Sequence, residues 1–457
     1  MGRARVILID PFGRRNRLFH KHFVRDWTGA TVPGQIPFPP LDLMYAAAYL
    51  RSLGHDTAII EANVRHLSHK AVVDIIENSP SDFVLIPSSY FSLSEDRLLA
   101  VLIRKHLPRI QIIFSGPLVT YDPSLVLNNG EADFVILGEL EQAAADIVSG
   151  KYEENIAYKR EGRIVRGTRT LIDLSRLSLP ARDLIDNQSY RYAIFNKRNP
   201  VTLMTVSRGC PHSKCVFCNS SLYTLNQFRY RQLDSVITEI EEIAFKYDIK
   251  EIFFRDQAFT ANRELVYGLC EYLLSNNIDL SWRATTRADL VDKELLLLMR
   301  RAGCYQLSVG FETNHQVSLD ASGKGIMVAQ SEFAAKAIKD AGIELVGLFM
   351  LGMPGDTVSS IKSLSEFAIT LRVDYAQFNQ FDFSPGAPIY EDYLKDRSRF
   401  VPARISRKYA SLSSREFYFR PRKIFQIIKK INSPGDIVFF TELVINSMLH
   451  RFSYDEY

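Results

Sequence analysis

The sequence lacks the features that mark secreted, membrane-spanning or nucleic-acid-binding chains. Its 457 residues hold only five cysteines, in no paired framework, which favours a reducing compartment over a disulfide-bonded secreted fold. No apolar run approaches the length of a membrane-spanning helix, and the N-terminus enters an apolar strand without the core of a signal peptide. The net charge of +4 is mild for this length and gives no indication of a nucleic-acid partner. We therefore expect a cytoplasmic protein.

The sequence also lacks internal repeats and low-complexity tracts. No G-x-G-x-x-G opens the first predicted helix, so a nicotinamide-dinucleotide site is disfavoured. Apolar residues make up 46% of the chain and charged residues 24%, which is the composition of a globular protein. The length exceeds what one hydrophobic core usually supports, so we expect two or three domains.

Predicted strands and helices alternate through residues 1–160. Continuous apolar strands of this kind predict a parallel sheet with helices on both faces, the doubly wound Rossmann-like arrangement. Helices are predicted at Leu41–Leu53 and Leu98–His106. The predicted strands are Arg5–Asp10, Thr57–Glu61, Asp82–Pro87, Ile110–Phe114 and Asp133–Leu137.

Small and polar residues follow three of these strands. They are Ser88 and Ser89, then Ser115 and Gly116, then Gly138 and Glu139. Ligands of such sheets bind at the carboxyl ends of the strands. Because small residues there let backbone approach a large flat ligand closely, we expect a ligand site at this edge. The long loop His20–Pro40 is interpreted as a cover over a domain interface.

Residues 161–199 are predicted to be an ordered linker, and residues 200–395 a second domain of six strand–helix units. Six parallel units predict a partial (β/α)6 barrel of the TIM type, with its chemistry at the carboxyl ends of the strands. The predicted helices are Leu233–Phe245, 262–276, 291–302, 327–341 and 357–371. The predicted strands are Val201–Val206, Glu251–Phe254, Leu280–Ala284, Gln306–Phe311, Leu345–Met350 and Ala376–Phe378.

Three of the five cysteines follow the first barrel strand, at Cys210, Cys215 and Cys218. Three closely spaced thiolates can hold three irons of a cubane iron–sulfur cluster and leave the fourth iron open. A structural zinc is the alternative, with a fourth ligand from His212, Cys270 or Cys304. Disulfide pairing is disfavoured because three crowded thiols cannot pair evenly. Cys270 and Cys304 fit packing positions in a helix and before a strand.

Polar residues and glycines recur at the predicted carboxyl ends of the barrel strands. Each one has a structural explanation, such as an Arg287–Glu312 ion pair or glycines in ordinary turns. Their repetition at one rim favours a binding site. Tyr375, Phe381 and Tyr390 could line its opening or belong to the core. The rim residues are Asp256, Gln257, Arg283, Arg287, Glu312, Gly352, Pro354 and Gly355.

The cysteine run, with Arg208-Gly209-Cys210-Pro211 and Phe217-Cys218-Asn219 around it, resembles the cluster loop of radical S-adenosylmethionine (SAM) enzymes. It is most similar to their cobalamin-binding branch. Four residues separate Cys210 from Cys215, where three are usual. The segments PPLDLMYAAAYLRSLGHDTAIIEA, SDFVLIPSS, IIFSGP and DFVILGELE resemble the cobalamin-binding domain of that branch. No D-x-H-x-x-G is present, so no histidine is marked as an axial ligand to cobalt.

The resemblance implies three cofactors. A 4Fe–4S cluster would be held by the three cysteines, and its open iron would chelate SAM. Asp256 would lie near the methionine end of SAM, Arg287 and Glu312 near its polar groups, and the Gly352-Met353-Pro354-Gly355 turn beside adenine. The strict G-G-E sequence of other branches is absent. Cobalamin would contact the residues that follow the strands of residues 1–160, namely Ser88, Ser89, Ser115, Gly116, Gly138 and Glu139.

The activity implied is a C-methyltransferase that uses a 5′-deoxyadenosyl radical on an unactivated carbon of a small-molecule or lipid-like substrate. An external one-electron donor such as flavodoxin or ferredoxin would be its partner. The alternative keeps both cofactors but forms rings, couples carbons or oxidises without methyl transfer. An alternative of another class is a non-catalytic cobalamin or iron–sulfur sensor, which predicts a decayed barrel rim.

Residues 396–457 carry three basic clusters, RISRK, RPRK and IIKK, followed by the apolar stretch DIVFFTELVINSML. This pattern predicts a small helical region. A helical cap on the barrel with a solvated basic face is one interpretation. Peripheral contact with anionic lipid at the inner membrane face is the other, since basic amphipathic helices lie on such surfaces.

Overall fold

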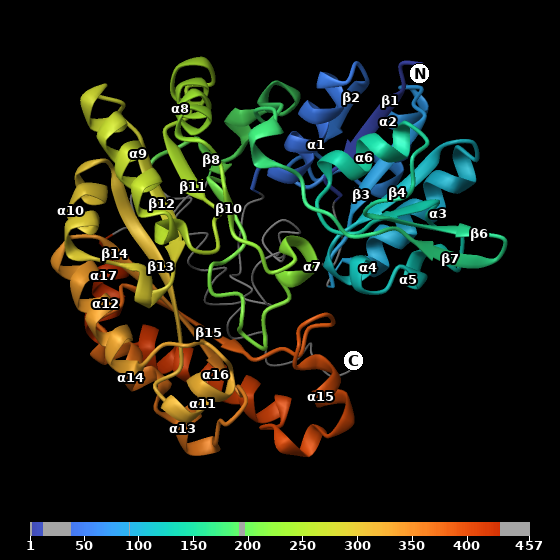
Figure 1. The fold of residues 1–457 in the computed structure, drawn as a ribbon. Helices are drawn as coiled ribbons and strands as arrows, with labels where there is room; N and C mark the ends of the chain where they lie inside the picture. Colours follow the sequence, from blue (N-terminus) through green and yellow to red (C-terminus); the bar gives the residue numbers. More distant parts are fainter. Residues whose placement is uncertain (1, 12–37, 91, 192–196, 430–457) are drawn as a thin grey trace. The chain divides into compact units, whose positions relative to one another are not determined.

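The computed structural model describes residues 2–11, 38–90, 92–191 and 197–429, and the chain divides into two compact units (Figure 1). Of the described residues, the first unit comprises 2–11, 38–90, 92–190 and 219–225, and the second comprises 191, 197–218 and 226–429. Most of the predicted loop His20–Pro40 and the apolar stretch beyond residue 429 lie outside the described residues. In the described part of the chain, no helix is long and apolar enough to cross a membrane.

The first unit is built on a seven-stranded sheet whose order is β2-β1-β3-β4-β5-β6-β7. Its first five strands are parallel, and all five predicted strands are present. The order reverses between β1 and β3, which makes their carboxyl ends a topological switch point. The strands are β1 (Arg5–Ile9), β2 (Asp56–Ile60), β3 (Phe83–Pro87), β4 (Gln111–Ser115) and β5 (Phe134–Ile136).

Two hydrophobic cores cover the two faces of this sheet. Alternate residues of β1 show the division, since Ile7 and Ile9 belong to one core and Val6 and Leu8 to the other. Helices α2 (His69–Glu77) and α3 (Leu93–His106) pack on the first face, and α1 (Leu41–Ser52) and α6 (Glu141–Val148) on the second. The short helices α4 (Pro117–Tyr121) and α5 (Ser124–Leu127) follow β4. The doubly wound prediction is therefore confirmed.

An antiparallel hairpin that the sequence did not predict extends this sheet beyond its five parallel strands. Strands β6 (Ile156–Arg160) and β7 (Arg163–Arg166) pair with each other, and β6 pairs antiparallel with β5 (Figure 1). The turn residues Glu161 and Gly162 both have positive φ, as a tight two-residue hairpin requires. Strand β7 has exposed charged side chains, so its sequence lacks the apolar run by which the other strands were predicted. The predicted domain boundary at residue 160 falls beside this turn.

The second unit contains a six-stranded, wholly parallel sheet in the order β15-β14-β13-β12-β11-β8. The six strand–helix units match the prediction of a partial barrel. Strand order begins at β15 and ends at β8, so these two strands are edges. The strands are β8 (Val201–Met204), β11 (Glu251–Phe254), β12 (Ser281–Thr286), β13 (Cys304–Glu312), β14 (Glu344–Leu351) and β15 (Tyr375–Gln380).

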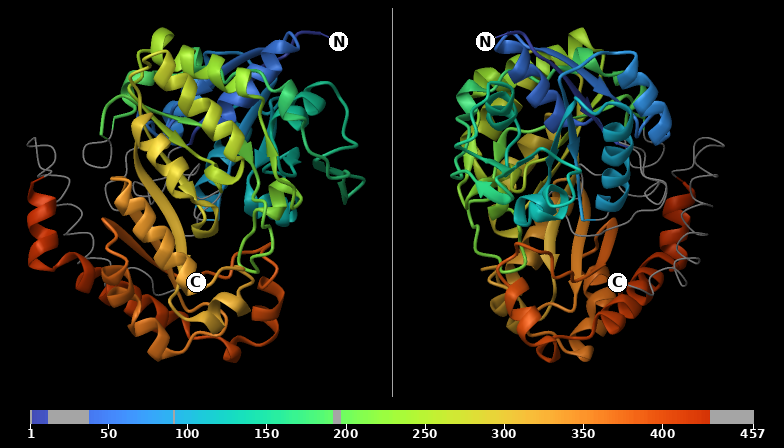
Figure 2. Two further views of the ribbon diagram at one scale, coloured as in Figure 1. Left: turned by 60° about the vertical axis from the view of Figure 1, so that its left-hand side comes forward. Right: turned by 90° about the vertical axis from the view of Figure 1, so that its right-hand side faces the viewer.

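Helices flank the outside of this sheet (Figures 1 and 2). One continuous core joins them to the strands, and both Cys270 and Cys304 are buried in it, as predicted. The predicted helix 357–371 is split at Ser363, whose hydroxyl donates to the Ser360 carbonyl. The helices are α8 (Leu233–Glu241), α9 (Arg263–Ser275), α10 (Lys293–Arg301), α11 (Gln316–Ala321), α12 (Val328–Asp340), α13 (Val358–Lys362) and α14 (Leu364–Thr370).

The C-terminal region is helical, with α15 (Tyr390–Lys395), α16 (Ala403–Tyr418) and α17 (Pro421–Ile428). Helix α16 protects the β15 edge, because the Tyr418 hydroxyl bonds both the amide and the carbonyl of Ala376, at 3.1 and 2.9 Å. Tyr375 begins β15 and lies at the end of the sheet opposite the cysteine loop, so it does not line the opening proposed for it.

Candidate functional site

The cysteines lie in a loop whose two ends are joined by a short antiparallel ribbon. Strand β9 (Ser207–Arg208) pairs with β10 (Arg229–Tyr230), where the chain leaves and re-enters the barrel. Gly209 follows with φ of 92°, and a Cβ at this residue would lie 2.0 Å from the Gln227 carbonyl oxygen. Only glycine fits this approach, so the base of the loop is closed tightly.

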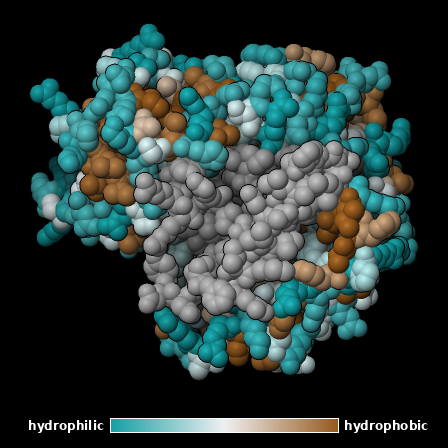
Figure 3. Space-filling model, turned by 180° about the vertical axis from the view of Figure 1, so that it is seen from behind, coloured by the Kyte–Doolittle hydropathy of each residue, from teal (hydrophilic) through white to brown (hydrophobic). Residues whose placement is uncertain are grey.

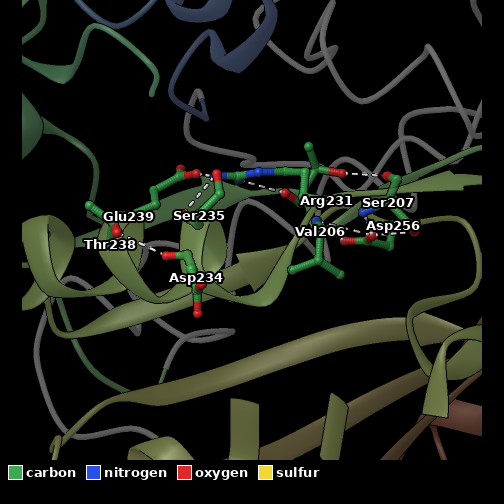
Figure 4. Close-up of polar contacts among 9 residues, drawn as sticks. Val206, Ser207, Arg231, Asp234, Ser235, Thr238, Glu239 and Asp256 are labelled. Carbon is green, nitrogen blue, oxygen red and sulfur yellow. Dashed lines mark hydrogen bonds and ion pairs between the residues drawn. The ribbon is translucent and has the colours of Figure 1, made fainter. Parts of the chain in front are cut away.

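Asp256 fixes the start of this loop. It follows β11, and its carboxylate accepts hydrogen bonds from the Val206 amide at 3.2 Å and from both the amide and the hydroxyl of Ser207 at 2.5 Å (Figure 4). Burial raises the pKa of Asp256 to about 6, although these three donors act to lower it. The observed role of Asp256 is to hold the chain where it leaves β8. Its contact with the methionine end of SAM stays a prediction.

A buried ion pair beside Asp256 supports the same segment. The Arg231 guanidinium pairs with the Glu239 carboxylate, and both side chains are almost fully buried (Figure 4). Arg231 also donates to the Thr205 carbonyl at 3.0 Å and to the Ser235 hydroxyl at 2.9 Å. Neither residue was singled out in the sequence, because an arginine beside β10 and a glutamate within α8 look like solvated charges.

A second loop, Ser322–Gly325, packs against residues 212–216 of the cysteine loop. The Val216 amide donates to the Ser322 carbonyl at 2.9 Å, and His212 Nε2 lies 2.6 Å from the Gly323 carbonyl oxygen. A Cβ on Gly323 would lie 2.6 Å from the Lys214 carbonyl oxygen, and one on Gly325 would lie 2.6 Å from the His212 ring. The two loops therefore fit only because both residues are glycine.

Two buried cations lie near the thiols. The Lys324 ammonium is 2.5 Å from Glu312 Oε1, and Arg287 binds Asp289 through two hydrogen bonds of 2.9 and 3.0 Å. Arg287 also donates to the Lys324 carbonyl at 2.9 Å. Burial raises the pKa of the Cys215 thiol to about 11, while Lys324 and Arg287 act to lower it.

Arg287 and Glu312 therefore do not pair with each other: Arg287 pairs with Asp289, and Glu312 pairs with Lys324. The Arg287–Glu312 ion pair considered as a structural explanation is not formed, since each residue pairs with a nearer neighbour in the chain. Lys324 and Asp289 were missed in the sequence. A lysine between two glycines, in Gly323-Lys324-Gly325, was a signal that could have found the first of them.

Glu312 has a strained backbone at the carboxyl end of β13. Its φ is 63°, and the register with β14 shifts between Gly310 and Glu312. A Cβ on Gly310 would lie 2.5 Å from Glu312 Oε1, so the carboxylate folds back over the glycine. Left-handed backbone at a residue other than glycine costs free energy and gathers at functional sites.

The glycine turn after β14 is rigid. The amides of Gly352 and Met353 donate to Asp356 Oδ2 at 3.0 and 2.9 Å, and the hydroxyls of Ser318 and Ser360 donate to Oδ1. Gly352 has φ of 93°, which glycine adopts without strain. Asp356 therefore sets the shape of the turn that also contains Pro354 and Gly355. The placement of adenine beside it stays a prediction.

Arg283 lies below the rim rather than on it. It is the third residue of β12, its guanidinium lies 4.7 Å from the centre of the Phe253 ring, and its Nε is 3.9 Å from Glu251 Oε1. Because β12 extends to Thr286, only Arg287 follows the strand.

In the first unit, Ser88 and Gly116 meet at the carboxyl ends of β3 and β4. The Ser88 amide donates to the Ser115 carbonyl at 2.7 Å, and a Cβ on Gly116 would lie 1.8 Å from the Ser88 carbonyl oxygen. The Ser88 hydroxyl is buried and has no hydrogen-bond partner within the part of the chain that the structure describes. A buried hydroxyl without a partner is costly unless a ligand completes it, which fits a bound cofactor at this edge.

The remaining predicted contacts of this edge already have partners. The hydroxyls of Ser89 and Ser92 are 2.9 Å apart, and Ser92 donates to Asp96 at 2.7 Å. Glu139 accepts a hydrogen bond from the Ile172 amide at 3.2 Å. A Cβ on Gly138 would lie 2.8 Å from the Arg169 guanidinium, which binds the Leu222 carbonyl. Their contacts with cobalamin stay predictions.

The donor chemistry of the cysteine loop suits an iron–sulfur cluster. Cys210, Cys215 and Cys218 form no disulfide bond and are partly exposed. Among the described residues, no three histidine, cysteine, aspartate or glutamate side chains gather around one point as ligands of a single ion do. A cubane cluster binds each thiolate at a separate corner, so its ligands need not converge in that way. Three thiols near buried cations fit this group.

Comparison with known families agrees with this arrangement. The family model of the radical SAM superfamily matches residues 204–368, and that of the B12 binding domain matches residues 29–148. The radical SAM match favours an iron–sulfur cluster over zinc at the three cysteines.

Similar proteins span most of the chain. An uncharacterized methyltransferase of Pyrococcus horikoshii is 29% identical over 77% of this chain and 78% of its own length. An anaerobic magnesium-protoporphyrin IX monomethyl ester cyclase of Rubrivivax gelatinosus is 26% identical over 80% of this chain and 67% of its own length. The structure of the radical SAM methyltransferase TsrM from Kitasatospora setae, with cobalamin and a cluster bound, has a TM-score of 0.67. It is 15% identical and covers 86% of this chain and 75% of that one, so it supports the fold alone.

Proposed function

We propose that this chain, which belongs to the radical SAM enzymes that carry a B12-binding domain, is a C-methyltransferase acting on an unactivated carbon. Its cofactors are a 4Fe–4S cluster, SAM and cobalamin. When bound, they supply a 5′-deoxyadenosyl radical that takes a hydrogen atom from the substrate carbon, and a methyl group for that carbon. A small-molecule or lipid-like substrate is part of the proposal.

The chain's own residues bind and orient these groups. We assign the cluster to Cys210, Cys215 and Cys218, in a loop held at its base by Gly209 and Asp256. The polar rim then faces SAM, and the turn shaped by Asp356 supports its nucleoside. The SAM residues proposed are Asp256, Arg287, Glu312, Gly352, Pro354 and Gly355, and the cobalamin residues are Ser88, Ser89, Ser115, Gly116, Gly138 and Glu139.

The observation that carries the proposal is the cysteine loop itself. Three partly exposed thiols follow the first strand of a partial barrel, and two buried cations, Lys324 and Arg287, lie near them. This places soft ligands and compensating charge at the edge where barrel enzymes carry out chemistry. The intact rim argues against a non-catalytic sensor.

Isotope transfer tests the reaction. Anaerobically reconstituted protein would be incubated with methyl-labelled SAM, a one-electron reductant and metabolite extract from the producing cells. We expect 5′-deoxyadenosine together with label in an extract-derived product. Formation of 5′-deoxyadenosine with no label in any product would exclude methyl transfer.

A second candidate is ring formation, carbon–carbon coupling or oxidation without methyl transfer. The Rubrivivax cyclase motivates it, because its similarity spans both domains of this chain. The same experiment separates the two, since this candidate predicts consumption of a substrate without incorporation of label. Either reaction needs one electron for each cleavage of SAM, which we propose a flavodoxin or ferredoxin supplies.

We also propose that α17 places the enzyme on the inner face of a cytoplasmic membrane. This helix buries a charged side chain and exposes apolar ones. Lys423 is 5% exposed, while Ile424, Phe425 and Ile428 are 41%, 58% and 56% exposed. Lys423 binds the Asp374 carbonyl and lies over the ring of Tyr375. The apolar face therefore points away from the barrel.

The charge around this apolar face supports anionic lipid as its partner. Arg422 is exposed on α17, exposed Lys429 follows the helix, and Arg420 precedes it. A helix with this pattern binds anionic lipid through both its apolar area and its charge. Figure 3 shows one face of the molecule, over which hydrophobic side chains, drawn in brown, are scattered among hydrophilic ones.

Vesicle sedimentation tests the contact. The full chain should bind vesicles of phosphatidylserine and phosphatidylcholine but not phosphatidylcholine alone. Exchanging Ile424, Phe425 and Ile428 for serine should abolish binding. A matched variant with serine at Leu297 and Phe333, which are 54% and 51% exposed on α10 and α12, should bind normally. Equal binding of both variants would overturn the proposal, as would failure of the unaltered chain to bind.

A further inference from the structure

The loop Gly323-Lys324-Gly325 packs against the cysteine loop and contains one charged residue, Lys324. Its glycines have φ of 66° and 68° and lie against the backbone of Lys214 and the ring of His212. The Val216 amide, next to Cys215, donates to Ser322, which precedes the loop. These contacts hold the backbone of Lys324 against the cysteine loop, and the ion pair with Glu312 holds its ammonium where it acts electrostatically on Cys215.

The Lys324 ammonium is buried together with its counterion. Only 8% of its side chain and 7% of that of Glu312 are exposed. Burial lowers the pKa of Lys324, but the Glu312 carboxylate, 2.5 Å away, outweighs this effect and holds it above its ordinary value. The side chain therefore remains charged at neutral pH.

The buried Lys324–Glu312 pair contributes little net free energy to folding. Taking two charges out of water offsets much of their attraction, and well-packed apolar side chains of the same size often stabilise a fold as well or better. Glu312, the acidic member of the pair, also adopts left-handed backbone. Strain and buried charge at one place indicate a role other than packing.

We infer that Lys324 sets the reduction potential of the cluster bound through Cys215. This rests on the proposed function, because it requires a cluster at the three cysteines. One-electron reduction adds a negative charge to the cluster, and a fixed cation in a poorly solvated site stabilises that added charge. Lys324 thereby makes the cluster easier to reduce. It is a positioning residue that acts through the cluster and not on substrate.

Redox titration of reconstituted full-length protein tests the inference. The midpoint potential would be followed by electron paramagnetic resonance, without SAM or substrate. Lys324→Met removes the charge at similar length, and Lys324→Met with Glu312→Gln also removes the carboxylate that the first change leaves unpaired. Lys324→Arg keeps the charge. Lys339→Met, which removes a cation of α12 that pairs with Asp374, is the matched control.

We expect both Lys324→Met variants to titrate at more negative potentials than the unaltered protein. The single variant should show the larger shift, because Glu312 then lacks its counterion. Lys324→Arg and Lys339→Met should keep the original midpoint. Unchanged midpoints in iron-replete Lys324→Met proteins would overturn the inference. Loss of iron from every Lys324 variant, Lys324→Arg included, would do the same by assigning the residue a structural role.

The outcome is independent of the reaction catalysed. A protein that reduces its cluster as expected but transfers no methyl group would contradict the proposed methyl transfer and leave the role of Lys324 intact.

Discussion

Asp256 Oδ1 lies 2.5 Å from both the amide nitrogen and the hydroxyl oxygen of Ser207, three residues before Cys210. One carboxylate at the end of β11 thus orients the first turn of the cysteine loop. The same carboxylate is buried, so its ionisation opposes folding even while its hydrogen bonds hold the loop.

Because Asp256 is buried, its ionisation makes the free energy of unfolding depend on pH. Burial raises its pKa from 3.8 to about 6, so between these values the folded state keeps a proton that the unfolded state releases. Stability contributed by that proton is present at low pH and is lost as the pH rises through about 6, a change of about 3 kcal/mol.

Urea unfolding across this range would measure it. In Asp256→Asn the dependence should vanish, so the difference in unfolding free energy between the two proteins should change with pH. Ser207→Ala, which removes one donor and keeps the carboxylate, is the control and should retain the dependence. A pH-independent difference between the unaltered protein and Asp256→Asn would contradict this explanation.

The Arg231–Glu239 pair should be more costly to break than to replace. Arg231→Met leaves a buried carboxylate without its cation, and we expect a loss of about 3–5 kcal/mol in unfolding free energy. Adding Glu239→Leu should recover much of this loss. Guanidinium unfolding of the single and double variants would check it, and a double variant less stable than Arg231→Met would show the pair to be favourable in itself.

Ser88→Ala separates ligand binding from folding. Since the hydroxyl is buried without a partner, its removal should leave thermal stability without ligand unchanged or slightly raised. Cobalamin affinity, measured by absorbance titration, should fall by roughly tenfold if the hydroxyl bonds the cofactor, the equivalent of about 1.4 kcal/mol. Ser94→Ala, at the solvent-facing start of α3, should change neither quantity. Undiminished affinity would remove Ser88 from the cobalamin site.

Gly352→Ala tests the turn that is proposed to face adenine. A Cβ there would lie 2.2 Å from the Ser406 hydroxyl oxygen, and the φ of 93° disfavours any side chain. We expect weaker SAM binding by calorimetry and a lower melting temperature. Adding Ser406→Ala should restore stability only partly, because it relieves the clash and not the backbone strain. Full recovery in the double variant would show that the clash alone mattered.

The sheet strands were the most predictable part of the fold. Continuous apolar runs such as 133–137 and 345–350 became buried parallel strands because burial on both faces demands such composition. The β6–β7 hairpin was missed because its exposed edge carries charged side chains, which have no apolar signal.

The candidate site was predictable by residue type and less so by partner. The three cysteines, Glu312 and Arg287 stood out by spacing and position. Their partners Lys324 and Asp289 did not. Which residues pair depends on how the loops fold against the barrel, and loop conformation produces no periodic pattern in the sequence. Asp256 was found, but its hydrogen bonds to Ser207 depend on a contact across 49 residues.

The central claim is that Cys210, Cys215 and Cys218 hold the cluster that cleaves SAM. Its most direct test is 5′-deoxyadenosine production by anaerobically reconstituted protein with reductant, compared with a variant that carries alanine at all three cysteines. We predict about four irons for each unaltered chain and 5′-deoxyadenosine from that protein alone. Production by the alanine variant, or zinc in place of iron in the active unaltered protein, would contradict the claim.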